Sequence, residues 1–501
     1  MSTPDAPTAA PTEVATPWRR LDPRMLVIGP ANALVRLLPV IVILLVTGQG
    51  DVTRLWIAAG FGVLVVLGSM MTWRTTRYRI TPDRVELHSG WLSRQRRSVP
   101  RDRIRTVDLT AKLLHRVFGL SVVQVSAGAG AAAEHSGLSL DAVSKPEAER
   151  LRRELLDRSP SAVDAPVLPP VQELARLRWS WLRLAPLTFS SLAGIAALAG
   201  TAFNLVDDLG IDPREIGPID DAGERFSSTP IWLGVLLILA VLGVIAVIGS
   251  LLLFAERWYG YRLTREVGAD GSSVLRVKRG LLTRRSLSVA EQRLRGAEVS
   301  EPLLLRAGGG AQCRALSTGL SSKDAQSGAL QPQVPRAEAH RVAAAALRAD
   351  PSEITLAALR RHPRAALLRR MTRALVPSAV VVLVAFWLGW WIPDLSWLGP
   401  TALLLLPPAV LLAWDRYRNL GHQLTARHLV TRQGSLVRRT VALQQHGVIG
   451  WTMRQSLFQR RAGLVTLEAV TAAGHGGYVV LDLAAGDAVA LADAATPNLL
   501  P

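Results

Sequence analysis

The sequence predicts an α+β membrane protein in which six transmembrane helices form three pairs, each followed by a small β-rich domain with a C-terminal helix as its cap. Three observations support this fold class. A glycine and arginine motif occurs three times, and long apolar segments precede each copy. Apolar and charged residues are also segregated along the chain, which has 501 residues, 49% of them hydrophobic and 19% charged. Such segregation is typical of membrane spans that alternate with soluble domains.

The repeated motif has five positions at constant spacing. Its three copies are Gly90, Arg94, Ile104, Arg116 and Gly119; Gly280, Arg284, Leu294, Arg306 and Gly309; and Gly434, Arg438, Val448, Arg460 and Gly463. In every copy the first glycine and the last arginine are 26 residues apart. Five matched positions without a gap indicate one ancestral unit present three times.

Six apolar segments predict the transmembrane helices. In chain order they cover residues 34–46, 55–73, 184–206, 231–255, 375–392 and 397–414. A helix needs about 20 residues to cross a bilayer, so the first span must begin near Met25. The three predicted pairs therefore occupy residues 19–73, 184–255 and 375–414, and residues 1–18 before them read as a disordered tail rich in Pro, Thr and Ala.

The distribution of charge predicts the orientation of the spans. Basic residues precede each pair, whereas the connector at 207–230 inside the second pair is acidic. Because positively charged segments stay in the cytoplasm, we expect both termini and all three domains to be cytoplasmic. The basic stretches at 159–183 and 350–374 also contain apolar residues. They predict helices that lie at the membrane interface, or serve only as topology signals.

The three domains, which we call modules, are predicted at 74–158, 256–349 and 415–495. Each starts with a strand hairpin that leads to Gly90, Gly280 or Gly434, where a tight turn requires positive φ. An arginine-rich strand follows, then a short helix that ends at Gly119, Gly309 or Gly463. In the outer modules a strand pair comes next, and a helix closes every module. The middle module diverges, because the glycines at 308–310 are expected to weaken its next strand.

This arrangement resembles the bacterial pleckstrin-homology-like membrane proteins of the YdbS- and YdbT-like family, formerly a domain of unknown function. The resemblance covers nearly the whole chain from Arg19. It depends on the span pairs, the Tyr78-Arg79-Ile80-Thr81 opening, the Gly-x-Leu turn and the Leu/Phe-x-Arg-x-x-Gly signature. Three modules with six spans are similar to the larger, YdbT-like type. The resemblance implies pleckstrin-homology-like folds, with two curled antiparallel sheets capped by a helix, in a bacterial cell membrane.

The sequence offers no pattern of catalytic, cofactor-binding or metal-binding residues. The nine histidines are scattered singly, and we find neither a nucleophile elbow nor a phosphate-binding loop. The single cysteine, Cys313, excludes an intramolecular disulfide. We therefore predict a protein that is not an enzyme and carries no cofactor.

The net charge of +19 suggests that the modules bind anionic lipids of the cytoplasmic leaflet, and other membrane proteins are possible partners. Nucleic acid is discounted because the basic segments are tethered to spans. The predicted binding residues are Arg94, Arg96, Arg97, Arg284, Arg285, Arg438 and Arg439. The alternative interpretation of these arginines is an edge strand protected by charge against aggregation. The arginines at 116, 306 and 460 are predicted to bind carbonyls within their own modules, and contact with a lipid phosphate is the alternative. The second functional hypothesis is a transport or gating component built from the six spans.

Overall fold

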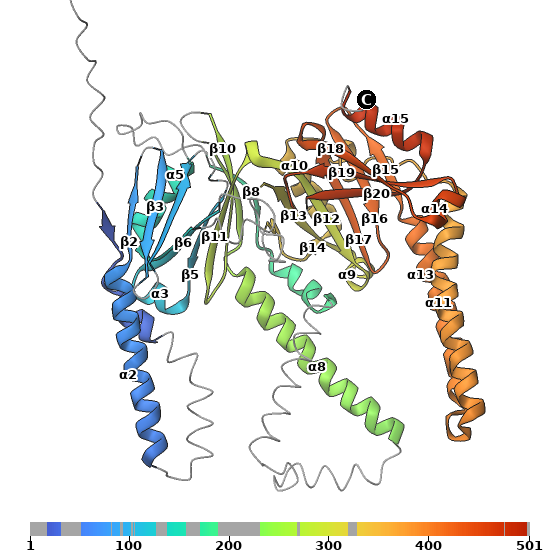
Figure 1. Ribbon diagram of the computed structural model, residues 1–501, viewed down its shortest axis with the longest axis horizontal. Coiled ribbons are helices and arrows are strands. Elements are labelled where there is room, and N and C mark those ends of the chain that lie inside the picture. Colours follow the sequence, from blue (N-terminus) through green and yellow to red (C-terminus); the bar gives the residue numbers. More distant parts are fainter. Residues whose placement is uncertain are drawn as a thin grey trace, which may run out of the picture.

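A computed structural model describes residues 18–31, 52–81, 83–90, 94–101, 104, 106–126, 138–156, 171–188, 231–267, 271–318, 328–474 and 476–497. The β-sheets form a row, and the long helices extend from this row to the same side (Figure 1). The architecture is α+β, as predicted.

Long apolar helices form the membrane part of the described chain. They are α2 (Val52–Thr75), α8 (Ile231–Trp258), α11 (Arg364–Trp391) and α13 (Leu406–Arg418), the last preceded by η6 (Pro393–Leu395), α12 (Leu398–Ala402) and η7 (Leu403–Leu405). Three segments of the described residues are long and apolar enough to cross a membrane, namely Ala240–Trp258, Arg364–Trp391 and Pro393–Arg418. The expected first span and most of the expected third span lie outside the described residues.

The third pair is a tight helical hairpin, as the sequence suggests. Glycine permits the close approach of its helices, because a Cβ atom at Gly399 would lie 2.5 Å from Cδ1 of Phe386. Small residues at such contacts are common between membrane helices.

The first module consists of two sheets, a short helix and a capping helix. Its elements are β1 (Arg19–Arg20), β2 (Arg77–Ile80), β3 (Arg84–Ser89), β4 (Gln95–Pro100), β5 (Thr106–Ala111), α3 (Leu113–Val117), β6 (Leu120–Ser126), β7 (Leu138–Ser144) and α5 (Lys145–Leu156). Val85, Val107, Val123 and Leu140 are fully buried in its core.

The second module repeats this order. Its elements are β8 (Val171–Arg176), η2 (Trp179–Leu187), β9 (Arg262–Val267), β10 (Ser273–Arg279), β11 (Arg284–Ala290), η4 (Glu291–Arg293), β12 (Leu294–Pro302), α9 (Leu303–Ala307), β13 (Gly310–Ser317), β14 (Val334–Pro335) and α10 (Arg336–Leu347), with η5 (Pro351–Glu353) after it. Its core contains Leu263 and Val299 and continues into the third module through Val430 and Ala442.

The third module closes the row. It contains β15 (Gly421–Leu424), β16 (His428–Gln433), β17 (Val437–Gln444), η8 (Gln445–Gly447), β18 (Val448–Arg454), α14 (Leu457–Arg461), β19 (Leu464–Thr471), β20 (Gly477–Ala484) and α15 (Ala485–Ala495).

The first strand of each sheet precedes the membrane helices in sequence. Strand β1 pairs with β2 and β8 pairs with β9, while Arg360 forms a bridge with His422 of β15. The spans are therefore inserted between the first and second strands of a module. This finding corrects the interfacial helices expected at 159–183 and 350–374. Residues 171–176 are a strand because the sheet edge satisfies their backbone groups, and α11 begins at Arg364 and continues directly into the span.

The divergent glycines of the second module do not prevent strand formation. Strand β13 starts at Gly310 and pairs with β12 along its length. The missing side chains make room for η2, which packs on this module through buried Trp181 and Leu184. A Cβ atom at Gly308 would lie 2.4 Å from Cδ1 of Leu187, and one at Gly310 would lie 2.6 Å from Cδ1 of Leu305. The expected start of the third span at Leu184 is thus wrong, because this residue belongs to η2.

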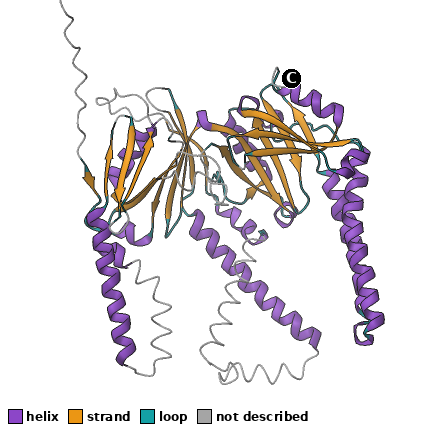
Figure 2. Ribbon diagram, viewed as in Figure 1, coloured by secondary structure: helices purple, strands orange, loops and turns teal. Residues whose placement is uncertain are grey.

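The sheets run without interruption from one module into the next (Figure 2). A seven-stranded sheet has the order β7-β6-β5-β11-β10-β9-β8, and a six-stranded sheet has the order β14-β13-β12-β17-β16-β15. At the first joint β5 pairs with β11, so that Arg284 lies opposite Ala111. At the second joint β12 pairs with β17, and the equivalent Arg438 lies opposite Glu301. The three modules therefore form one continuous array.

A candidate anion-binding groove between the first two modules

The first glycine of each motif copy forms a tight turn between two strands. The φ angles of Gly90, Gly280 and Gly434 are 104°, 109° and 99°, as the turn interpretation requires. A Cβ atom at Gly280 would lie 1.9 Å from the carbonyl oxygen of Thr283, so no other residue fits there without a shift of the backbone. These glycines are therefore explained by the fold.

The last glycine of each copy ends a short helix. Gly119, Gly309 and Gly463 have φ angles of 69°, 71° and 63°, and they follow α3, α9 and α14, respectively. Left-handed glycine is the usual way to end a helix.

In the first two modules the arginine at the end of the short helix contacts a residue that follows its own module in the chain, and not its own module as predicted. Arg116 donates a hydrogen bond to the carbonyl oxygen of Leu281. Arg306 forms an ion pair with Asp415 at 3.0 Å. The continuous sheets bring each short helix beside the next module, which explains the difference. Arg460 is exposed, and its side chain forms no ion pair or hydrogen bond with another residue that the structure describes.

A groove of about 1190 Å³ opens at the first joint. Its walls come from β5 and α3 of the first module, the start of α5, and strands β9, β10 and β11 of the second module. Among the described residues that line it, Glu149 is the only acidic one. The eight cationic residues are Arg116, Lys145, Arg262, Arg276, Lys278, Arg279, Arg284 and Arg285.

The groove has an excess of positive charge that its own acidic residue does not neutralise. Burial lowers the pKa of Lys278, and the neighbouring Arg276 lowers it further. Burial and the charge of Arg285 lower the pKa of Arg279 to about 10. Nearby cations therefore disfavour the charge of each of these two groups. An anion bound in the groove would relieve such repulsion.

A four-residue ion cluster closes one side of the groove and fastens the joint. Arg276 lies 2.7 Å from Glu149 and 3.2 Å from Glu266, and Arg152 lies 2.9 Å from Glu266. Burial alone would raise the pKa of Glu149, but the hydrogen bond and charge of Arg276 lower it overall. Arg276 and Glu149 are therefore engaged with each other. The exposed cations of the groove are Lys145, Arg262, Lys278, Arg284 and Arg285.

The structure gives the three predicted arginine sets three different surroundings. Arg284 and Arg285 line the groove. Arg438 is held by buried Glu301 at 2.5 and 2.8 Å, and Arg439 lies 3.6 Å from Glu298, so this set belongs to the second joint.

The arginines of the first module lie at a free edge. Strand β4 is the last strand of its four-stranded sheet, and Arg94, Arg96 and Arg97 are exposed. The charged edge strand that the alternative interpretation expects is therefore found in the first module. In the other two modules the equivalent strand lies inside a sheet.

Sequence reasoning missed the other cations of the groove. Arg262, Lys278 and Arg279 lie outside the motif, and the pairing of β9, β10 and β11 within the second module brings them close to Arg284 and Arg285. The available signal was period-two alternation in β10, where Arg276 and Lys278 share one face of the strand.

The groove lies at the end of a membrane helix. Tyr259 and Gly260, which line it, directly follow α8. Exposed apolar side chains surround this end, including Val117 on α3 and Leu282 in the turn after β10. Trp179 stacks edge-on against Tyr259 with ring centroids 6.3 Å apart. Such aromatic residues favour the boundary between hydrocarbon and water, so the groove opens close to the head groups.

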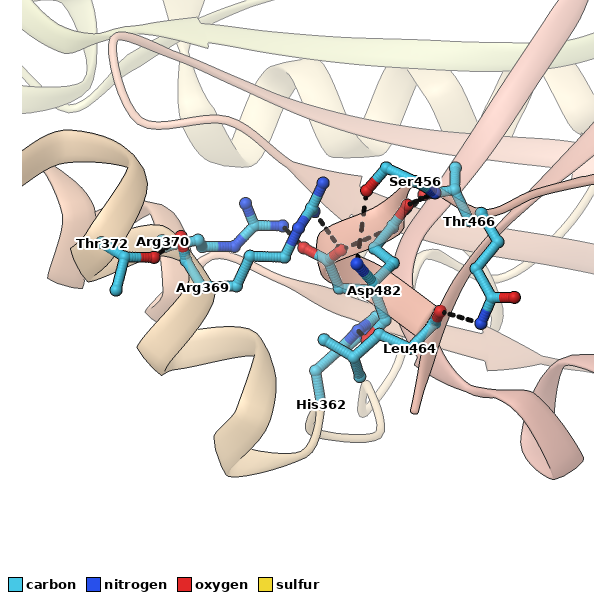
Figure 3. Close-up of polar contacts among 10 residues, drawn as sticks. His362, Arg369, Arg370, Thr372, Ser456, Leu464, Thr466 and Asp482 are labelled. Carbon is cyan, nitrogen blue, oxygen red and sulfur yellow. Dashed lines mark hydrogen bonds and ion pairs between the residues drawn. The ribbon is translucent and has the colours of Figure 1, made fainter. Parts of the chain in front are cut away.

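A separate buried network fixes the third module on its membrane helix (Figure 3). Asp482 of β20 is fully buried and accepts hydrogen bonds from Arg369 and Arg370 of α11. Gln459 donates to the same carboxylate at 2.9 Å. Nδ1 of His362 lies 3.2 Å from the backbone oxygen of Asp482, and its Nε2 lies 3.2 Å from Nδ1 of His422.

This histidine pair predicts a loss of stability in acid. Burial lowers the pKa of His422 to about 4 and also lowers the pKa of His362. In the unfolded chain histidine titrates near 6.5. As the pH falls from about 6.5 to 4 the unfolded state therefore takes up protons that the folded state does not, and the free energy of unfolding decreases. The His422→Gln variant should show a shallower decrease when thermal unfolding in neutral detergent is followed at pH 7.5, 6 and 5. An equal decrease of stability with falling pH in the original protein and in the His422→Gln variant would contradict this prediction.

Comparison with known proteins supports the predicted resemblance. A family model of the bacterial PH domain matches residues 31–159 and 373–495. The chain is 23% identical over 484 residues to the UPF0699 transmembrane protein YdbT of Bacillus subtilis (strain 168), which covers 91% of this chain and 93% of that protein. No solved structure matches the chain. Together with the apolar helices, these similarities identify a transmembrane protein.

Proposed function

Since the chain belongs to the bacterial PH domain family, we propose that it is a non-catalytic protein of the bacterial cell membrane whose groove at the first joint binds an anionic lipid head group. In this proposal six spans form three pairs, and both termini and all three modules are cytoplasmic. The modules act as one scaffold on the inner surface, because their sheets are continuous.

The observation that carries the proposal is the charge of the groove. Eight cationic residues and one acidic residue line it, at the end of α8. Guanidinium groups suit phosphate because they offer paired N–H donors in one plane. The cytoplasmic leaflet supplies such phosphates, and each cation near its surface contributes about 1 kcal/mol to binding.

Neutralising two adjacent exposed arginines of the groove, Arg284 and Arg285, tests this proposal. The R284Q/R285Q variant should bind anionic lipid more weakly by about 2 kcal/mol, or roughly 30-fold, if each cation contributes about 1 kcal/mol. The measurement is a titration of fluorescent phosphatidylglycerol into the full chain in neutral detergent. A zwitterionic probe, phosphatidylcholine, should bind both proteins equally weakly.

The chain offers a matched control for this titration. R94Q/R97Q removes the same number of charges from β4, outside the groove, and should leave the affinity for phosphatidylglycerol within about threefold, because distant exposed charges are screened. If the two variants lose affinity equally, binding depends on overall charge, and the groove is not the site.

A further inference from the structure

Among the described residues, strand β4 is an open sheet edge at the beginning of the array. It is the last strand of the sheet β1-β2-β3-β4, and residues 95–98 are all exposed. Its equivalents β11 and β17 both pair along this same edge with a strand of the preceding module. No module precedes the first one in the described chain. An unpaired edge offers a row of backbone donors and acceptors to an added strand.

The two joints show what this edge accepts. At each joint an antiparallel strand docks on this edge, and the register is the same at both. Arg284 and Arg438 occupy the same motif position, and the residues opposite them, Ala111 and Glu301, are also equivalent positions. The docked strand carries carboxylates. In β12, Glu301 is 1% exposed and holds Arg438, while Glu298 lies opposite Val441. By the motif spacing, the equivalents of Arg438 and Val441 in β4 are Arg94 and Arg97.

We propose that the outer edge of β4 binds an extended acidic segment of another protein as an additional antiparallel strand. In the register of the second joint, a segment with two carboxylates three residues apart places one opposite Arg94 and the other opposite Arg97. Backbone pairing supplies affinity, and these two charge pairs supply selectivity. The proposal goes beyond lipid binding and does not depend on the groove.

Charge disfavours a second copy of this chain as the occupant. The free strand at the other end of the array is β18, and its sequence Val448–Arg454 contains no acidic residue. In the register of the joints it would place Gln455 opposite Arg94 and Thr452 opposite Arg97. Neither arginine would then face a carboxylate, so charge pairing across the strands would not support this contact.

Strand β12 itself provides the probe. A fluorescent peptide with the sequence of residues 294–302 contains both Glu298 and Glu301 and has the length of the docked strand. Fluorescence anisotropy with the full chain in neutral detergent should show saturable binding. The same peptide with both glutamates replaced by glutamine should bind at least tenfold more weakly. A peptide N-methylated on alternate residues should not bind, since it cannot complete the ladder.

Two variants of the chain locate the binding site. R94Q/R97Q should weaken binding of the acidic peptide at least tenfold and leave phosphatidylglycerol binding unchanged. R284Q/R285Q should weaken phosphatidylglycerol binding and leave binding of the acidic peptide unchanged. Each proposal can therefore fail independently of the other. The inference is overturned if the glutamine peptide binds as well as the acidic one, or if R94Q/R97Q does not weaken binding. It is also overturned if a peptide of residues 448–454 binds more tightly, which would indicate association between copies of the chain.

Discussion

Replacing Asp482 with asparagine is expected to lower the free energy of unfolding of the third module by about 3–5 kcal/mol, the usual cost of removing one partner from a buried ion pair. The carboxylate is fully buried between Arg369 and Arg370, and the Arg370 side chain is 6% exposed. Loss of the negative charge would leave these guanidinium groups buried without a counter-ion. Asparagine keeps the shape of the side chain and tolerates the positive φ of 58° at this position.

The effect should be confined to the attachment of the third module to α11. Hydrogen exchange of the full chain in neutral detergent should show faster exchange in β20 and in the first turns of α11, and thermal unfolding should begin at a lower temperature. Glu468→Gln provides the control. It removes the partner of Arg454, whose side chain is 72% exposed, and should cost at most about 1 kcal/mol. Equal effects of the two substitutions would contradict the role given to Asp482.

The Glu301→Gln variant is expected to open the second joint. Glu301 is 1% exposed, receives two hydrogen bonds from Arg438 and lies 3.1 Å from Arg336. Burial raises its pKa, but the hydrogen bonds and charge of Arg438 lower it overall, so the carboxylate is charged at neutral pH. Its neutral replacement should weaken the joint by about 3–5 kcal/mol, because two guanidinium groups lose their counter-ion.

The same sample contains a control for this prediction. Hydrogen exchange should become faster in β12 and β17, which pair across the second joint, and should not change in β5 and β11 at the first joint. Uniform acceleration over both joints would indicate general destabilisation. Unchanged exchange at β12 and β17 would show that Glu301 does not hold the modules together.

Local features of the modules could be predicted from the sequence because they depend on neighbouring residues. The turn at Gly280 and the helix end at Gly309 follow from backbone conformations that favour glycine, and the structure has positive φ at both. The apolar segments from 375 to 414 predicted a helical hairpin, which α11 and α13 form. In each case composition and spacing carry enough information.

The joints could not be predicted, because strand pairing between modules depends on residues far apart in the sequence. Arg284 and Arg438 occupy the same motif position, but one faces Ala111 and lines a groove, while the other faces Glu301 and is held at a joint. The same limitation hid the strand at 171–176, whose partner β9 lies beyond α8 in the chain. The structure therefore places the three sets of arginines that were expected to bind lipid in three different surroundings, namely a groove, a joint and an open sheet edge.

The divergent middle module shows a further limit of sequence reasoning. Its glycines suggested a weak strand, but they make room for η2 in the structure. The arginines of this module, Arg284 and Arg285, line the candidate groove. Low strand propensity at 308–310 therefore reflects packing against η2, which precedes α8 in the chain.

The central claim is that the groove at the first joint holds the phosphate of an anionic lipid. A structure of the full chain in lipid nanodiscs that contain phosphatidylglycerol tests it most directly. We predict phosphate density within hydrogen-bond distance of the guanidinium group of Arg284 or Arg285, with its acyl chains directed along α8. A groove that contains only solvent, while ordered lipid phosphates lie elsewhere on the protein, would contradict the claim.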